Sequence, residues 1–94
     1  MDISVLVPLY NEAESLPSLY EWIVRVITEH DLSYEVVFVN DGSSDDSWDV
    51  IRTLSAKDEH VRGICFRRNY GKSAALHCGF QTVKGDVVIT MDAD

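Results

Sequence analysis

Apolar residues follow two alternating spacings along the chain, and the alternation predicts helices placed between strands. Short runs rich in Val and Ile, typical of strands buried on both faces, occur at Ile3–Pro8, Tyr34–Val39, Val61–Phe66 and Asp86–Met91. Between these runs, apolar residues recur every three or four positions, which marks one face of a helix. The helices are expected at about 16–27, 45–56 and 73–83. Ser15 is expected to cap the first helix, and Gly85 to close the third.

The resulting order, β-α-β-α-β-α-β, predicts a Rossmann-like, doubly wound α/β fold with a parallel sheet. The common strand order of such sheets places the first and fourth strands side by side, where the winding reverses. Ligands bind at that point, outside the carboxyl ends of the strands. We therefore expect the functional residues in the four segments that follow the strands. These segments are residues 9–12, 41–44, 67–72 and 92–94.

The composition is typical of an ordinary globular protein, and the length allows one hydrophobic core of modest size. It has 94 residues, of which 46% are hydrophobic and 26% charged. Its apolar runs are far shorter than the roughly 18 residues that a membrane span needs. No leader is visible, and two cysteines without one suggest free thiols in a reducing compartment. We expect a cytoplasmic location.

The net charge of −8 is unevenly distributed. Residues 1–60 carry 13 acidic and 3 basic side chains, whereas residues 61–94 carry 5 basic and 3 acidic ones. No acidic residue occurs from Arg62 to Lys84. The acidic total argues against a nucleic-acid partner. The local basic stretch could receive a phosphorylated ligand, or it could be a solvated surface.

Asp92 and Asp94 stand two residues apart at the end of the fourth strand, so an extended backbone would point both to the same side. Paired carboxylates repel unless a cation lies between them, and hard oxygen ligands suit Mg²⁺ or Mn²⁺. The sequence therefore predicts a divalent metal site, with a pair of solvated acids as the alternative.

The other three strand ends carry polar and aromatic side chains. Asp41 could accept N–H bonds from a nucleobase, or it could belong to a turn that caps the next helix. Tyr10 could stack on a base and Glu12 could bond a ribose, or Glu12 could simply suit the helix dipole. Arg68 and Lys72 flank a Gly-containing loop that could hold phosphate or be solvated. The chain has neither a G-x-G-x-x-G nor a Walker A motif.

Taken in order, these segments resemble the N-terminal half of a family 2 glycosyltransferase with the GT-A fold. The resemblance covers the chain from Ile3 to Asp94. It rests on the motifs Val7–Glu12, Val39–Asp45, Arg68–Lys72 and Gly85–Asp94. The Arg-Asn-Tyr-Gly-Lys segment is most similar to the bacterial dolichol-phosphate-mannose-synthase-like branch, which transfers sugars to polyprenyl phosphate.

The resemblance implies a role for each matching position. The residues facing the nucleotide-sugar donor, UDP- or GDP-linked, would be Pro8, Leu9, Tyr10, Glu12, Asp41, Arg68, Lys72, Asp92 and Ala93. Asp41 would bond the base, Arg68 and Lys72 would lie on the phosphate side, and Asp92 with Asp94 would hold the metal. The family transfers sugars with inversion. No residue of this segment matches a catalytic base.

Family members continue well past the Asp-x-Asp segment, so residues 1–94 correspond to the nucleotide-sugar-binding half without the acceptor half. We expect this part to bind nucleotide weakly and not to transfer sugar. The acceptor would be a polyprenyl phosphate or a saccharide. A membrane would be reached only through that lipid or other parts of the protein, at its cytoplasmic face. Residues 87–89 would form an open edge that invites pairing with a second copy.

Two other functions are alternatives to the glycosyltransferase hypothesis. A non-catalytic nucleotide-binding or regulatory module would share every donor-side feature. A receiver-type signalling domain needs paired acids after the first strand, where this chain has Pro8, Leu9 and Tyr10, so the sequence argues against it.

Overall fold

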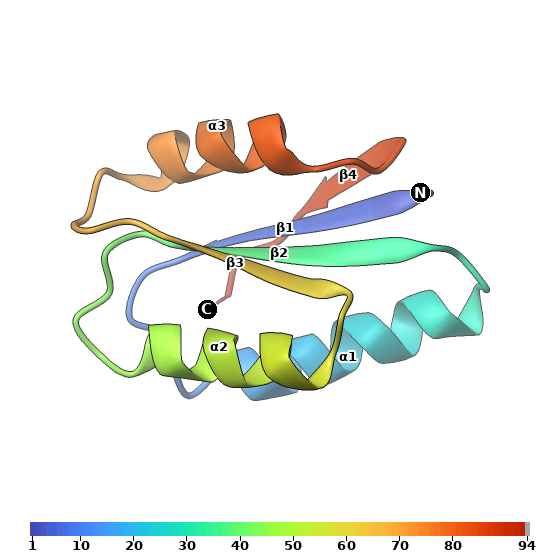
Figure 1. Cartoon of the computed structure of the whole chain (residues 1–94), viewed down its shortest axis with the longest axis horizontal. Coiled ribbons are helices and arrows are strands. Elements are labelled where there is room, and N and C mark those ends of the chain that lie inside the picture. Colours follow the sequence, from blue (N-terminus) through green and yellow to red (C-terminus); the bar gives the residue numbers. More distant parts are fainter. Residues whose placement is uncertain (94) are drawn as a thin grey trace.

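Four strands and three helices alternate along the chain in a computed structural model that describes residues 1–93 (Figure 1). The strands are β1 (Ile3–Leu9), β2 (Tyr34–Asn40), β3 (Val61–Cys65) and β4 (Val87–Thr90). The helices are α1 (Leu16–Glu29), α2 (Ser47–Lys57) and α3 (Lys72–Thr82). The predicted order is confirmed, and each boundary lies within two residues of its expected position.

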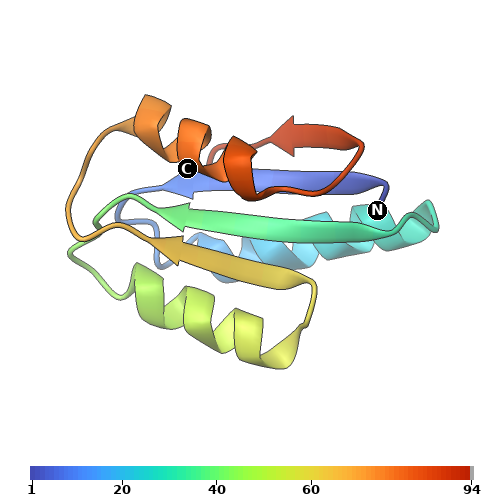
Figure 2. The ribbon, with the colours of Figure 1, turned by 45° about the horizontal axis from the view of Figure 1, so that its top comes forward.

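The four strands form one parallel sheet in the order β3-β2-β1-β4. The first and fourth strands are therefore neighbours, as predicted for a doubly wound sheet. Val5 of β1 lies opposite Val36 of β2 on one side and Ile89 of β4 on the other. Figure 2 shows all four strands running in the same direction, so that their carboxyl ends meet at one edge of the sheet.

Helices cover both faces of the sheet, which explains why the strands are apolar throughout. α3 lies on one face, and α1 and α2 lie on the other (Figure 1). Leu6, Val37 and Val39 pack with Ala75 on the α3 side. The alternate strand positions, including the fully buried Phe38, pack beneath α1 and α2. Burying one such large side chain contributes roughly 1.5–3 kcal/mol, so this two-sided core is the main source of stability.

Two residues that the sequence predicted to mark helix ends have other roles in the structure. Ser15 occupies the position before α1 but makes no capping bond, because its backbone is already helical (φ −82°, ψ −25°). Its hydroxyl donates to Oε2 of Glu12 at 3.0 Å instead. Gly85 does not close α3, which ends at Thr82 and is followed by Val83 in an extended conformation. Gly85 is needed for close packing instead, since a Cβ there would lie 2.5 Å from the backbone nitrogen of Ser4.

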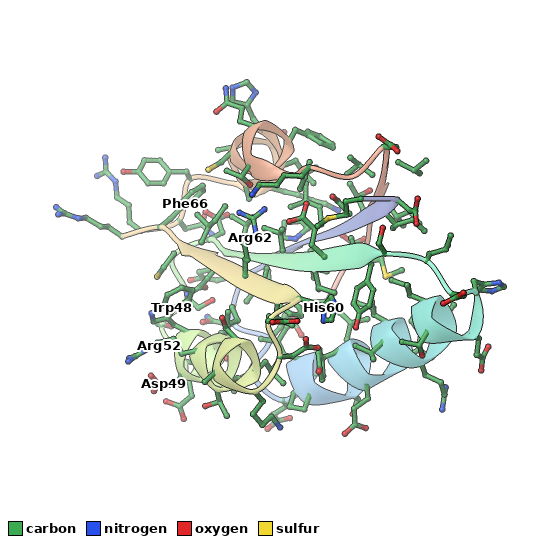
Figure 3. All side chains as sticks on the ribbon, turned by 45° about the vertical axis from the view of Figure 1, so that its right-hand side comes forward. Trp48, Asp49, Arg52, His60, Arg62 and Phe66 are labelled. Atoms are coloured by element: carbon green, nitrogen blue, oxygen red, sulfur yellow. The ribbon has the colours of Figure 1, made fainter. Side chains whose placement is uncertain are left out.

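α2 packs closely on the edge strand β3 (Figure 3). Gly63 makes this approach possible, because a Cβ there would lie 2.6 Å from Ile51 and 2.9 Å from the ring of Trp48. A shallow hollow of about 380 Å³ remains here, and its described lining contains no acidic side chain.

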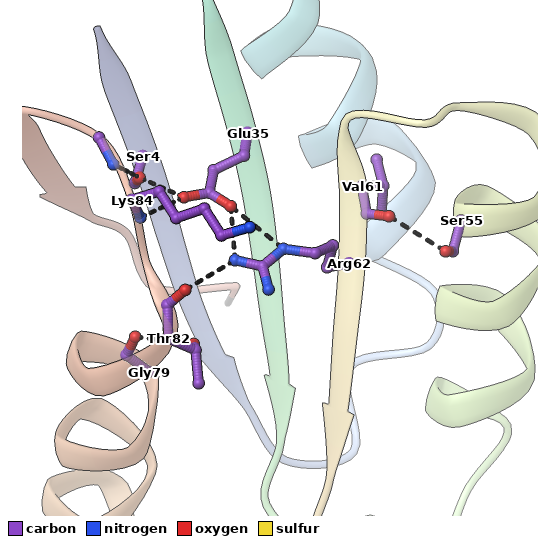
Figure 4. Close-up of polar contacts among 9 residues, drawn as sticks. Ser4, Glu35, Ser55, Val61, Arg62, Gly79, Thr82 and Lys84 are labelled. Atoms are coloured by element: carbon purple, nitrogen blue, oxygen red, sulfur yellow. Dashed lines mark hydrogen bonds and ion pairs between the residues drawn. The ribbon is translucent and has the colours of Figure 1, made fainter. Parts of the chain in front are cut away.

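A buried polar network ties the connection between α3 and β4 to the first two strands (Figure 4). Glu35 is 4% exposed, and its carboxylate accepts bonds from the Ser4 hydroxyl (2.6 Å) and the Lys84 backbone N–H (2.6 Å). Arg62 pairs with the other oxygen of Glu35 and also donates to the carbonyl of Thr82 (2.9 Å). Burial favours a raised pKa for Glu35, but these bonds outweigh it and hold the pKa below its ordinary value.

Candidate functional site

A pocket of about 400 Å³ lies at the carboxyl ends of the strands. Its lining comes from every strand end that the sequence pointed to. The lining residues are Pro8, Leu9, Tyr10, Glu12, Asp41, Asn69, Gly71, Lys72, Asp92 and Ala93. The structure thus brings together all the predicted donor-binding residues that it describes, except Arg68. Asp94 lies outside the described residues.

The segment after β1 supplies the aromatic side of the pocket. Tyr10 is 47% exposed, so its ring is available to a ligand. Asn11 has a left-handed backbone (φ 55°), which turns the chain sharply from β1 toward α1. The Glu12 carboxylate is held by the Ser15 hydroxyl at 3.0 Å.

Hydrogen bonds fix this segment to the loop between β2 and α2. Oδ1 of Asn11 accepts the backbone N–H groups of Ser44 (2.8 Å) and Asp45 (3.2 Å). In return, the hydroxyls of Ser43 and Ser47 accept the N–H groups of Asn11 (2.8 Å) and Glu12 (3.0 Å). These reciprocal bonds join the segment after β1 to the loop between β2 and α2. No feature of the sequence predicts this role of the serines, because the bonded groups lie more than thirty residues apart along the chain.

Asp41 connects the end of β2 to the loop that precedes α3. Its side chain is almost fully buried, with Oδ1 accepting the N–H of Tyr70 (2.8 Å) and Oδ2 the N–H of Gly71 (3.0 Å). The neighbouring Gly42 has φ 72° and lies so close to the backbone of Arg68 that a Cβ would come within 2.1 Å of it. Asp41 therefore lines the pocket and also positions the loop that leads into α3.

Of the two basic residues predicted to contact phosphate, only Lys72 lines the pocket. Lys72, the first residue of α3, extends into the pocket, where its Nζ lies 2.6 Å from Oδ1 of Asp92. The guanidinium of Arg68 lies 5.1 Å from the centre of the Tyr70 ring, and Arg68 is not among the lining residues. Asn69 and Gly71 line the pocket instead. The sequence offered one signal for them, their place inside the predicted loop.

The chemistry of Asp92 fits a hard divalent cation. Its side chain is 60% exposed and already attracts a cationic group. Mg²⁺ is commonly bound through one or two carboxylates together with water and substrate phosphates, so a large protein cage is not required. Within residues 1–93, no group of three or more His, Cys, Asp or Glu side chains is placed to hold a metal.

None of the described helices is both long enough and apolar enough to cross a membrane.

Comparison with known proteins agrees with this arrangement. The sequence profile described as "Glycosyl transferase family 2" matches residues 4–94. The undecaprenyl-phosphate 4-deoxy-4-formamido-L-arabinose transferase of Aeromonas hydrophila is 43% identical over 93 residues, which cover 98% of this chain and 28% of that relative. The chain thus spans little more than a quarter of the length of the relatives it matches.

Two solved structures show the same architecture. The mannosyltransferase PcManGT from Pyrobaculum calidifontis, in complex with GDP-Man and Mn²⁺, is 29% identical with a TM-score of 0.76. The match covers 98% of this chain and 27% of that one. Residues 1–349 of TarS of S. aureus superpose with a TM-score of 0.81 at 23% identity, over 100% of this chain and 28% of that one, and support the fold alone.

Proposed function

The chain belongs to glycosyl transferase family 2, and we propose that its pocket binds the nucleotide-diphosphate end of a sugar donor together with Mg²⁺ or Mn²⁺. One observation carries the proposal. An exposed aromatic ring, three carboxylates and one ammonium converge on a single pocket at the switch point of the sheet. This combination suits a ligand with a base, a ribose and phosphates. The GDP-Man and Mn²⁺ held by PcManGT are of this kind.

On the nucleoside side, Tyr10 offers its ring to the base, and Pro8 with Leu9 gives that part of the pocket a stiff apolar wall. Asp41 and Glu12 accept hydrogen bonds from the base and the ribose. Each carboxylate oxygen has two lone pairs, so the bonds that Asp41 accepts from the loop leave capacity for a ligand donor.

On the phosphate side, Lys72 neutralises phosphate oxygens, and Asp92 holds the metal together with Asp94. Ala93, 7% exposed, adds a small apolar side chain to the lining next to Asp92. A bound divalent cation neutralises the charge that develops on the leaving diphosphate. In our proposal the acceptor attacks in a single displacement, which inverts the anomeric centre.

The acceptor belongs to the part of the relatives that this chain does not span. The names of those relatives point to undecaprenyl phosphate, and we propose a polyprenyl phosphate or a saccharide as the acceptor class. A lipid-linked acceptor would place the reaction at the cytoplasmic face of a membrane. Residues 1–94 supply the donor and metal half, so by themselves they bind nucleotide without transferring sugar.

Calorimetric titration of UDP, GDP and their sugars, with Mn²⁺ and then with a chelator, tests the proposal. We expect one nucleotide to bind, and Asp92→Asn to remove the part of its affinity that depends on metal. Asp86→Asn is the matched control, because Asp86 is an exposed acid that does not line the pocket. Nucleotide binding that depends neither on the metal nor on Asp92 would contradict the role of Asp92 in holding a metal. Sugar transfer by the purified 94-residue chain would contradict the division into halves.

A further inference from the structure

Lys72 and Asp92 form an ion pair across the pocket, between the start of α3 and the segment after β4. The Nζ of Lys72 lies 2.6 Å from Oδ1 of Asp92, and their side chains are 61% and 60% exposed. Packing therefore does not lock the pair, since water reaches both partners. An ion pair of this kind can be exchanged at small cost.

The surroundings make Lys72 the natural counter-ion of Asp92. Among the described residues that line the pocket, Lys72 carries the one cationic side chain, whereas Glu12, Asp41 and Asp92 are acidic. Asp41 is already held by two backbone N–H groups, and Glu12 by the hydroxyl of Ser15. Asp92, in contrast, is paired with the ammonium group of Lys72.

We propose that Lys72 is a built-in counter-ion for Asp92, which a divalent cation displaces when it enters the pocket. This inference rests on the proposed function, because it takes Asp92 as a metal-binding carboxylate. A metal ion bound to the carboxylate would lie within a few ångströms of an ammonium that is itself in contact with Oδ1. Because the two cations repel each other at that separation, metal binding requires the ammonium to move away.

The displaced ammonium remains tethered to the first residue of α3, beside the same pocket. The diphosphate of a donor carries negative charge into this region as the metal arrives. Lys72 has a flexible stem and three donor hydrogens, so it can turn from Asp92 to phosphate oxygens without any movement of the backbone. Asp92 thus has a cationic partner in both states. Lys72 therefore opposes the metal when the nucleotide is absent and supports the nucleotide when the metal is present.

The test is a titration with Mn²⁺ alone, in which free Mn²⁺ is followed by electron paramagnetic resonance at low ionic strength. Exposed ion pairs alter a competing equilibrium by a factor of about two to five. We expect Lys72→Met to bind Mn²⁺ about two- to fivefold more tightly than the unaltered chain, and Lys72→Arg to match the unaltered chain. Lys84→Met is the charge-matched control, because Lys84 is exposed and does not line the pocket. With Mn²⁺ present, Lys72→Met should bind the nucleotide more weakly.

The opposite signs of these two effects distinguish an exchanged counter-ion from a lysine that only supports the fold. Equal or weaker Mn²⁺ binding by Lys72→Met would overturn the inference. So would a chain that binds no Mn²⁺ at all. In either case, nucleotide binding measured by calorimetry would decide the proposed function separately.

Discussion

The carboxylate of Asp41, at the end of β2, accepts the backbone N–H of Gly71 at 3.0 Å, thirty residues further along the chain. A second bond to the neighbouring N–H of Tyr70 makes Asp41 the anchor of the loop that leads into α3. The residue predicted to recognise the base is thus also the residue that fixes the loop before α3.

Asp41→Asn should weaken both the fold and nucleotide binding. An amide side chain offers one acceptor oxygen where the carboxylate offers two, so one loop N–H loses its partner at a cost of about 1–3 kcal/mol. Chemical denaturation and calorimetry measure the two effects. Asp46→Asn is the control, because Asp46 is an exposed acid on the adjacent loop with no side-chain capping bond. Equal stability of the two variants would show that the bonds of Asp41 are unimportant.

Two glycines with positive φ should respond differently to alanine. Gly42→Ala meets both a left-handed backbone (φ 72°) and the backbone of Arg68, whereas Gly71→Ala meets a φ of 100° and open space. Strain at such a position costs of order 1–3 kcal/mol, and the clash adds to it only at Gly42. We therefore expect Gly42→Ala to be clearly the less stable variant in urea denaturation. Comparable losses would argue against close contact between the two loops.

Glu35 should make the fold sensitive to acid. Burial favours a raised pKa, but the bonds from Ser4, Lys84 and Arg62 lower it below the ordinary value of 4.5. The contribution of Glu35 is therefore complete above that value and is lost as the pH falls through the lower pKa of the folded state. Glu35→Gln should reduce stability at neutral pH and flatten its decline below about pH 5. An unchanged slope in denaturant titrations across this range would contradict the assignment.

The outer edge of β4 should allow two copies of the chain to associate. Within residues 1–93 this strand pairs with β1 alone. Its apolar residues Val87 and Ile89 are 56% and 38% exposed. Unprotected edges of this kind favour strand pairing. We expect light scattering to detect dimers that increase with concentration, and Ile89→Lys to reduce them. A monomer at all concentrations would refute this prediction.

The fold could be predicted because its determinants are local and repetitive. The apolar runs through Val5, Val36 and Ile89 have the length and composition of buried parallel strands, and the strand-end rule then located Asp92 and Tyr10 in the same pocket. The contacts of Asn11 and Asp41 could not be predicted in the same way, because their partners lie about thirty residues away and include backbone groups. Glu35 gave no signal either, since one acid in an apolar run does not reveal which groups will surround it.

Residue-by-residue mapping of nucleotide binding tests the central claim most directly. Amide chemical shifts of the isotope-labelled chain would be followed by nuclear magnetic resonance as UDP or GDP is added with Mg²⁺. We predict that the largest changes fall on residues 9–12, 41, 69–72 and 92–93, the strand-end pocket. The hollow between α2 and β3, represented by Ser55 and Gly63, should stay unchanged. Changes gathered at that hollow, or none with either nucleotide, would contradict the assignment of this pocket as the donor site.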